Sequence, residues 1–365
     1  MSVDENTASQ QWPLVVGIDL GGTQIRAAVL QGAQIRARAA RLTGDDPTPE
    51  RVLPRIYATV QEALDEAGIT LAEIASIGVS TPGPLDSRTG TLYSPPNLPA
   101  WNGVPLRDIL RKKYGKPVFV ENDANAAALG EYLFGAGQGS QHMVYLTVST
   151  GIGGGVIIDG RLLEGVNGSA AELGHITIDW QGERCTCGNI GCLEALASGT
   201  AIANQANAAI ANGQGAELLA FARTMLEHTT TIPDKGALPR QDLSTQPLNP
   251  SMDQALLPEE ELRVTAQTVA RAAEAGIPLA RAIITSAAEA LGVGLVNILH
   301  IFSPEIIILG GGVMQMGNML MEPALKIVQE RAMRANLAEA RIVQAQLGVN
   351  VGLIGAGALP QHYQK

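Results

Sequence analysis

The three cysteines of this 365-residue chain lie within one short segment, at Cys185, Cys187 and Cys192, and His175 precedes them. Thiolate sulfur and imidazole nitrogen are the ligands that a tetrahedral zinc ion prefers. Two glycines within the segment permit the sharp turns that would direct three sulfurs to one point. The sequence therefore predicts a closed Cys₃His structural zinc site, with no open position for a catalytic water.

Two other interpretations of the cysteines stay open. They could cluster by chance, or two of them could form a disulfide. An odd number leaves one thiol over, and nothing else in the sequence indicates secretion. The spacing Cys-x-Cys-x₄-Cys is also not a common zinc-finger pattern.

A second group of polar residues follows a predicted strand at 117–120. The segment Glu121-Asn122-Asp123-Ala124-Asn125 has four polar residues out of five. Functional groups collect at the carboxyl ends of strands in α/β proteins, and a carboxylate there can accept a proton from a substrate hydroxyl. The alternative is a helix N-cap before a helix at 124–132.

Two glycine-rich turns, each between predicted strands, form the third feature. The first, Gly21-Gly22-Thr23, joins strands at 14–19 and 25–30, and the second, 150–155, joins strands at 143–149 and 156–159. Successive backbone N–H groups in such a turn suit a phosphate chain. One such hairpin is usually only a hairpin, and the spacing matches neither the P-loop nor the Rossmann fingerprint. Its recurrence about 130 residues later suggests two related halves.

Other residues near these turns also suit a nucleotide. Asp19, at the end of the first strand, could orient a magnesium ion through water. Glycines 310–312 follow a strand predicted at 305–309, and they would let a flat ligand such as adenine lie against the backbone. Asn97 lies in a Pro- and Asn-rich loop that would present its side chain rigidly, unless this loop is only a surface crossover.

The remaining elements follow from periodicity and from Gly and Pro punctuation. The segment 229–254 is predicted to be a surface insertion, and Pro258 to open a helix. The helix at 280–301 is nearly uncharged and is predicted to be buried between domains. We expect strands at 31–39 and 74–80 and helices at 49–68, 106–114, 196–212, 280–301, 320–335 and from 352.

Composition bounds the class of protein. Apolar residues make up 46% and charged residues 16% of the chain, and the net charge is −10. This acidity argues against nucleic-acid binding, which needs a basic patch. The polar N-terminus lacks a signal-peptide core, and no apolar run predicts a membrane span, so a cytoplasmic protein is expected. The length favours two domains, which we place at 13–120 plus 352–365 and at 121–351, the second with a zinc loop at 175–192.

Together these motifs resemble the ROK family of repressors and sugar kinases, closest to its glucokinase members. The resemblance covers almost the whole chain and preserves the order of the motifs. It is carried by 19–23, 96–101, 121–124, 149–155, 172–175 and 185–194. It implies an α/β, actin-like ATPase (ribonuclease H-like) fold whose two domains close over a cleft. It also implies transfer of a phosphoryl group from ATP, with Mg²⁺ and a structural Zn²⁺, to the 6-hydroxyl of glucose.

By matching motifs, Asp123 would be the general base, and the zinc would brace the loop that carries two sugar-facing carboxylates. His175 would link zinc and sugar through its two ring nitrogens. The implied sugar ligands are Asn97, Asn122, Asp123, Glu172, His175 and Glu194, and the implied metal ligands are His175, Cys185, Cys187 and Cys192. The implied ATP-binding residues are Asp19, Gly21, Gly22, Thr23, Gln24, Thr150, Gly151, Gly153, Gly154, Gly311 and Gly312.

The sequence departs from the family pattern at Gln24, where many members carry Lys, so an ionic contact to phosphate is lost or passes to Arg26. Rival functions are a kinase for N-acetylmannosamine, mannose or fructose and a non-catalytic sugar sensor. A repressor would need a helix-turn-helix before Asp19, where too few residues are expected to form one. A homodimer is expected from the family and from base rates, and the donor could also be polyphosphate.

Overall fold

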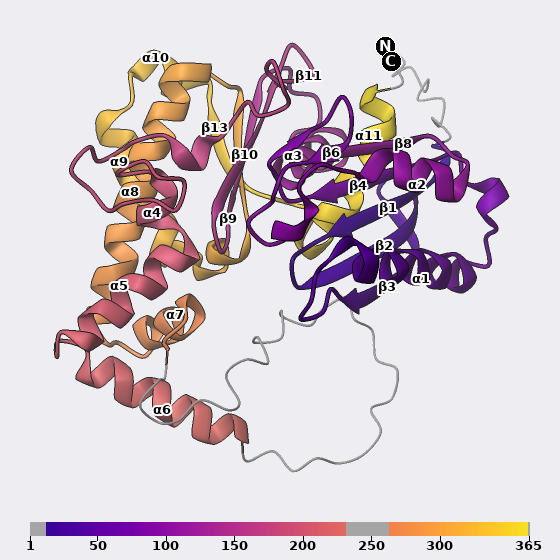
Figure 1. Cartoon of the computed structure of the whole chain (residues 1–365). Coiled ribbons are helices and arrows are strands. Elements are labelled where there is room, and N and C mark those ends of the chain that lie inside the picture. Colours follow the sequence, from indigo (N-terminus) through magenta and orange to yellow (C-terminus); the bar gives the residue numbers. More distant parts are fainter. Residues whose placement is uncertain (1–11, 231–262, 364–365) are drawn as a thin grey trace, which may run out of the picture.

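The computed structural model describes residues 12–230 and 263–363. Figure 1 shows two lobes, each built around one five-stranded sheet. Two helices, α3 (Asp123–Phe134) and α11 (Val351–Tyr363), pack against each other between the sheets. The fold therefore has a central helical layer that is shared by both halves.

The first sheet has the strand order β3-β2-β1-β4-β8. Strands β1, β2 and β3 form an antiparallel meander, and β4 and β8 run parallel to β1. A small sheet of β5, β6 and β7 and the helices α1 and α2 complete this half. The bounds are β1 Leu14–Leu20, β2 Gln24–Gln31, β3 Gln34–Leu42, α1 Pro49–Ala67, β4 Ser76–Thr81, β5 Leu85–Asp86, β6 Thr91–Leu92, β7 Val104–Pro105, α2 Leu106–Tyr114 and β8 Val118–Asn122.

The second sheet repeats this plan, with the order β11-β10-β9-β12-β13. Again a meander of three antiparallel strands is followed by two strands parallel to the first of them. This agrees with the two related halves expected from the paired glycine turns. The bounds are β9 Met143–Val148, β10 Ile152–Ile158, β11 Arg161–Leu162, α4 Leu193–Ala197, α5 Gly199–Ala211, α6 Ala216–Thr230, α7 Ala266–Glu274, α8 Pro278–Phe302, β12 Ile306–Gly310, α9 Asn318–Arg331, α10 Arg334–Glu339 and β13 Arg341–Gln344.

Small residues let the central helices approach closely. A Cβ at Gly355 of α11 would lie 2.3 Å from the carbonyl oxygen of Ala126 in α3. On the other side of α11, a Cβ at Gly78 of β4 would lie 1.8 Å from the carbonyl oxygen of Ala356. The Ala- and Gly-rich composition is thus used to stack a helix pair directly against a sheet.

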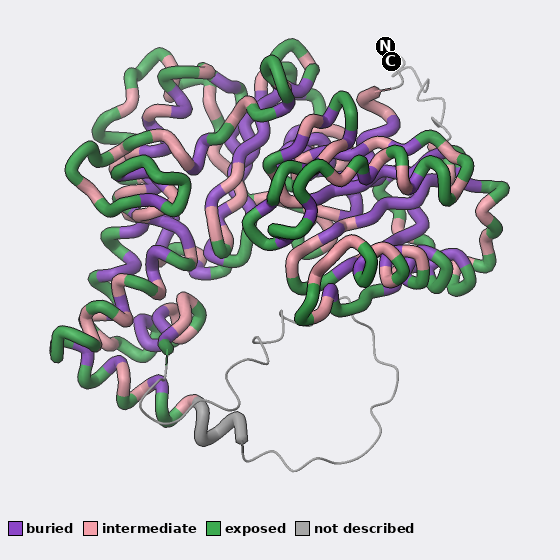
Figure 2. Tube along the Cα trace, viewed as in Figure 1, coloured by how far each residue is buried: buried purple, intermediate pink, exposed green. Residues whose placement is uncertain are grey.

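The buried residues form two large hydrophobic clusters, one in each half, and two smaller ones around α3 and α11. Figure 2 shows the buried backbone concentrated in the strands and on the inner faces of the helices. Among the described residues, α8 alone is long and apolar enough to cross a membrane by those criteria, and 61% of its most apolar stretch is buried inside the protein. Burial of this kind is typical of a core helix.

Several predicted elements differ from the structure. Gly153 to Gly155 lie in strand β10 and not in a turn, because the tight turn ends at Gly151. The helix expected at 196–212 is two helices, since Ser198 caps the second one, and the helix expected at 320–335 ends at Arg331. Helix α8 packs on the helices of the second half and does not lie between the halves.

Nearly all of the predicted insertion at 229–254, and the helix start at Pro258, fall outside the described residues.

Candidate active site and metal centre

Asp123 is the first residue of α3, at the carboxyl end of β8. The preceding residue, Asn122, caps the helix, and its Oδ1 accepts hydrogen bonds from the backbone N–H groups of Ala124 and Asn125. The capping interpretation is therefore confirmed, for Asn122. Asp123 is free of the capping task, although its own Oδ1 also accepts from Ala124 N at 2.8 Å.

The surroundings of Asp123 favour its protonated form. By surface area its side chain is exposed to solvent, although many protein atoms lie around it. Desolvation, with smaller contributions from the charges of Asp19 and Glu172, raises the pKa of Asp123 to about 6. A carboxylate with a pKa near the operating pH is suited to accept a proton from a hydroxyl.

A small pocket surrounds Asp123, and both halves of the protein contribute to it. Asn125 carries a buried Oδ1 with no hydrogen-bond partner among the described residues, while its Nδ2 donates to Glu121. An unpaired buried acceptor in a polar pocket is a candidate ligand for a substrate hydroxyl. The lining residues are Gly83, Pro84, Leu85, Asn122, Asp123, Asn125, Gly153, Gly154, Gly168, Ser169, Ala170 and Glu172.

The β1–β2 turn is held from outside by a buried threonine. Gly21 N–H donates to the carbonyl of Gln24 at 2.9 Å. Thr43, at the end of β3, donates from Oγ1 to the carbonyl of Gly21 at 2.8 Å and from its N–H to the carbonyl of Thr23. A Cβ at Gly22 would lie 2.6 Å from the Cβ of Asn97. Asn97 is therefore next to this turn.

Asp19 lies beside the same turn, and Arg26 of β2 is its partner. The Arg26 Nε donates to Asp19 Oδ2 at 2.9 Å, and a second guanidinium nitrogen also contacts this oxygen. Arg26 further donates to the carbonyl of Val349. Arg26 thus binds the Oδ2 of Asp19 and fixes this side chain. The Oδ1 of Asp19 has no hydrogen-bond partner among the described residues and could bind another ligand.

The β9–β10 turn, Ser149 to Gly151, is closed by a bond from Ser149 N–H to the carbonyl of Gly151 at 2.8 Å. The first residues of α5 reach it from one side, as Gly199 N–H donates to the carbonyl of Ser149 at 2.7 Å. On the other side Gly311, with φ of 95°, leaves a Cβ only 2.3 Å from the carbonyl of Val148. Only glycine fits there, so 310–312 pack directly against this turn.

Glu194 connects this turn to the cysteine segment. Its Oε2 accepts from the N–H of Ile152 at 2.8 Å, and its Oε1 lies 3.9 Å from the Sγ of Cys185. A Cβ at Gly151 would lie 2.5 Å from Glu194 Oε2, which explains the glycine. Glu194 was predicted as a sugar ligand, and the structure gives it a structural contact that sequence reasoning missed.

The predicted metal ligands do come together. One ligand atom from each of His175, Cys185, Cys187 and Cys192 lies within 4.8 Å of every other. His175 Nδ1 is 3.6 Å from Cys185 Sγ, and the Sγ atoms of Cys187 and Cys192 are 3.7 Å apart. Four ligands at about 2.3 Å from a central ion would lie about 3.8 Å apart, so the donor set fits a tetrahedral metal. The cluster could hold a metal ion.

The cysteines are free thiols, so the disulfide alternative is wrong for this structure. The segment is held by backbone bonds, with Cys185 N–H donating to the carbonyl of Asn189 at 2.8 Å. Gly191 lets the backbone before Cys192 lie directly against Asp179, because a Cβ at Gly191 would overlap the Asp179 carbonyl.

The structure groups the predicted residues in three places. Asn122, Asp123 and Glu172 share the pocket, whereas Asn97, His175 and Glu194 do not line it. Sequence reasoning missed Thr43, Asn125 and the segment 168–170. Asn125 lies two residues after Asp123 and could have been found from that spacing, but Thr43 and 168–170 carry no local signal and are brought in only by the fold.

Comparison with known proteins decides the family. The ROK family model matches residues 15–362. The chain belongs to the ROK family. Its fold is accordingly the actin-like ATPase fold.

A glucokinase of Thermotoga maritima is 34% identical to the chain over 348 residues, which cover 94% of this chain and 96% of that protein. A solved ROK family glucokinase from Streptomyces griseus, in complex with glucose and AMPPNP, gives a TM-score of 0.72 at 31% identity and covers 96% of this chain and all of that one. A xylose repressor of Caldicellulosiruptor bescii is 30% identical over 348 residues, or 94% of this chain and 77% of that protein.

Proposed function

We propose that this protein transfers the γ-phosphoryl group of ATP to the 6-hydroxyl of glucose. The observation that carries the proposal is the position of Asp123: a carboxylate of raised pKa, in a polar pocket bounded by both halves. Glucokinases among the relatives support the choice of glucose.

In this proposal Asp123 accepts the hydroxyl proton as the sugar oxygen attacks phosphorus. Phosphoryl transfer needs positioning and charge stabilisation more than covalent help, so one base is sufficient. A pKa of about 6 leaves Asp123 mostly ionised at neutral pH. The nearby Asp19 and Glu172 disfavour its charge and so make it a stronger base.

The proposed sugar ligands fall into two sets. Asn122, Asn125 and Glu172 line the pocket already, and the buried Oδ1 of Asn125 has no partner among the described residues. Asn97, His175 and Glu194 lie outside its lining, so their proposed role requires the two halves to close over the sugar, as in many kinases. Closure would also exclude water from the transferred phosphoryl group.

The two glycine turns are proposed to hold the phosphates through their backbone N–H groups, with Gly311 and Gly312 next to the adenosine. Asp19 Oδ1 is the candidate outer ligand for Mg²⁺, because Oδ2 is taken by Arg26. Magnesium would neutralise charge on the phosphates. Gln24 donates no charge here, so this turn relies on its backbone.

The four-residue His–Cys cluster is proposed to hold a structural zinc ion. Cysteine and histidine donors at these separations suit zinc, and four protein ligands leave no position for catalysis. The ion would fix the segment between Glu172 and Glu194. Since Glu194 also binds the backbone after the β9–β10 turn, the same brace would steady a phosphate turn.

The test is an ADP-release assay with Mg-ATP on glucose, mannose, fructose, N-acetylglucosamine and N-acetylmannosamine. We expect glucose to give the highest kcat/KM. Preference for another sugar would leave the base and the zinc in place but replace the substrate, because hexoses share most polar contacts and differ in pocket details.

A sugar-responsive regulator is the second candidate, favoured by the 30% identity to a xylose repressor. The same assay separates the two, since a regulator would bind sugar and release no ADP. Polyphosphate in place of ATP tests the donor. A homodimer also stays a prediction, and light scattering would measure it.

A further inference from the structure

A cavity of about 830 Å³ is separate from the Asp123 pocket and shares no residue with it. It is bounded by α2, the strand β8, the β5–β6 connection, Glu164 after β11 and the last turn of α11. Strand β8 is the edge of its sheet, so one side of its backbone is unpaired there. A cavity of this size is typical for a small-molecule ligand.

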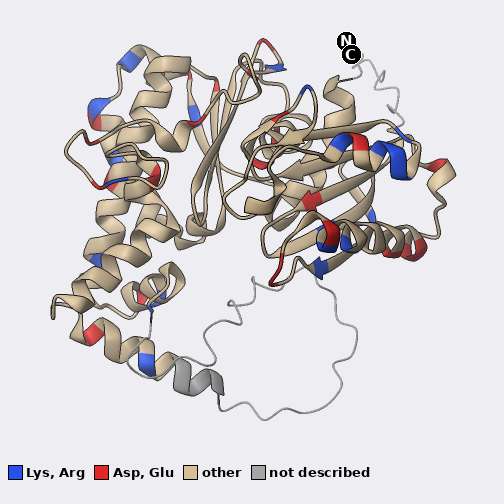
Figure 3. Ribbon diagram, in the orientation of Figure 1, with Lys and Arg blue, Asp and Glu red and all other residues tan. Residues whose placement is uncertain are grey.

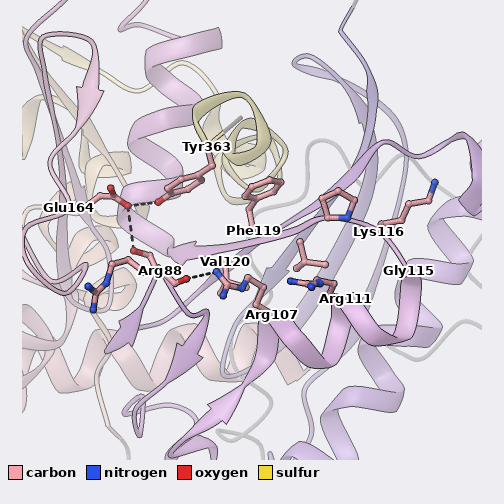
Figure 4. Close-up of a pocket in the computed structure, with 12 residues that line it drawn as sticks. Arg88, Arg107, Arg111, Gly115, Lys116, Phe119, Val120, Glu164 and Tyr363 are labelled. Atoms are coloured by element: carbon pink, nitrogen blue, oxygen red, sulfur yellow. Dashed lines mark hydrogen bonds between the residues drawn. The ribbon is translucent and has the colours of Figure 1, made fainter. Parts of the chain in front are cut away.

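Positive charge gathers at this cavity in a protein whose net charge is −10. Five of the 25 Lys and Arg residues lie between positions 107 and 116, four of them in α2, and Figure 3 shows basic residues along this helix. Arg107 and Arg111 are four residues apart and so occupy one face of that helix. Figure 4 shows their guanidinium groups across the opening from the rings of Phe119 and Tyr363.

The other cations around the cavity are already engaged. Arg88 binds Asp86, and Lys116 donates to the carbonyl of Ala72 at 3.0 Å. The ammonium group of Lys113, near the C-terminus of α2, lies over the ring of Tyr57.

Arg107 and Arg111 retain free donors. Arg107 gives one terminal nitrogen to the carbonyl of Arg88, and its buried Nε has no hydrogen-bond partner among the described residues but forms a long ion pair with Asp108 Oδ1 at 4.0 Å. The side chain of Arg111 makes no hydrogen bond or ion pair with any described residue. Two guanidinium groups on one helix face, that of Arg111 unpaired among the described residues, match the geometry of a phosphate group.

The opposite end of the cavity offers an acceptor. Tyr363 Oη lies 2.5 Å from Glu121 Oε2 and 2.7 Å from Glu164 Oε1. One hydroxyl carries one proton, so Tyr363 can donate to only one of the two glutamates at a time. Burial raises the pKa of Glu121. The second carboxylate oxygen of Glu164 is then available to accept from a ligand hydroxyl.

We propose that this cavity binds a phosphorylated polyol, such as a sugar phosphate, with its phosphate on Arg107 and Arg111 and a hydroxyl on Glu164. Glu121 connects the cavity to the pocket around Asp123. It contacts Tyr363 of the cavity, and it also accepts hydrogen bonds from the N–H of Asn122 and from Asn125 Nδ2. The site does not depend on which sugar the enzyme phosphorylates.

The test is calorimetric titration of the full chain, saturated with glucose so that the Asp123 pocket is filled, with glucose 6-phosphate as the probe. We expect one equivalent to bind. Arg111→Gln should weaken binding at least about tenfold, since it removes a charge-assisted pair. Lys112→Gln is the matched control on the same helix turn and should stay within about twofold. Because the side chain of Arg111 has no polar partner among the described residues, its removal should leave the unfolding temperature unchanged.

Inorganic phosphate and free glucose complete the design. We expect phosphate to bind more weakly than glucose 6-phosphate and to lose affinity in Arg111→Gln, and further glucose to produce no heat. Absence of glucose 6-phosphate binding, or binding that Arg111→Gln leaves unchanged, would overturn the site. Equal affinity for phosphate and glucose 6-phosphate would overturn the polyol assignment at Glu164. Binding is measured directly, so a protein inactive on glucose would leave the outcome readable.

Discussion

The two halves of this protein have the same sheet topology and different chemistry. In the first, β8 ends in Glu121-Asn122 and is followed by Asp123, and in the second the corresponding strand β13 ends in Val343-Gln344 and is followed by Ala345. Each sheet begins with a hairpin whose turn is rich in glycine or hydroxyl residues. Each half therefore contains a turn that could bind phosphate, but only the first half contains a candidate general base, Asp123.

The crossovers differ even more. In the first half a single helix, α1, connects β3 to β4, whereas in the second the connection from β11 to β12 holds the cysteine cluster and α4 to α8. A metal is a compact way to fix a long segment that has little secondary structure of its own. The comparison predicts that the second half depends on its metal and the first does not.

The largest expected effect is at the base. Asp123→Asn should lower kcat by about 10²–10⁴, the usual range for loss of general-base catalysis, and leave sugar affinity within about threefold. Gln344→Ala, at the end of the corresponding strand, is the matched control and should leave kcat unchanged. Steady-state kinetics with glucose and Mg-ATP measure both. A near-normal kcat in Asp123→Asn would remove the asymmetry between the halves.

The second effect concerns the metal. Cys187→Ala should lose bound zinc and raise KM for the sugar at least about tenfold, because ligand removal frees the segment between Glu172 and Glu194. Glu183→Ala, on the same segment but outside the donor set, should keep both. The zinc content of each variant is measured by mass spectrometry, together with its steady-state kinetics. Full sugar affinity in a zinc-free variant would show that this crossover needs no brace.

The third effect is a pH profile. With its pKa raised to about 6, Asp123 should be protonated and inactive below that value, so kcat/KM should fall about tenfold per pH unit on the acid side. Asp19→Asn removes a like charge and should move the midpoint to lower pH, but only in part, because desolvation is the larger cause. A midpoint that stays at the same pH would mean that Asp19 does not influence the base.

Sequence patterns predicted helices and strands well where a pattern is typical of only one kind of structure. The 3.6-residue period and Gly68 predicted α1 almost to the residue. The glycine run at 151–155 had two meanings, and the structure uses Gly155 for packing, since a Cβ there would lie 2.5 Å from Cβ of Ala128. Glycine signals a turn or a close approach equally well.

Parts of the site that depend on distant contacts could not be predicted. The sequence predicted that the four proposed metal ligands come together because three of them lie on one short loop. Thr43 reaches the first turn only because β3 returns beside β2, and Glu164 meets Tyr363 only because the chain ends between the two sheets. Long apolar helices were also ambiguous: α8 was expected between the halves, but the shared layer is made by α3 and α11.

The smallest effect tests that layer, where α3 and α11 are equivalent helices that meet through Gly130 and Gly355. A Cβ at Gly355 would lie 2.3 Å from a carbonyl oxygen, which cannot move aside, whereas one at Gly130 would lie 3.1 Å from its nearest atoms. Alanine gains about 1 kcal/mol of helix propensity at either position, but overpacking costs about 1–3 kcal/mol. We expect Gly355→Ala to lower the free energy of unfolding by urea and Gly130→Ala to leave it nearly unchanged. Equal losses would mean that the two helices share the strain of contact symmetrically, as their equivalent places in the two halves would suggest.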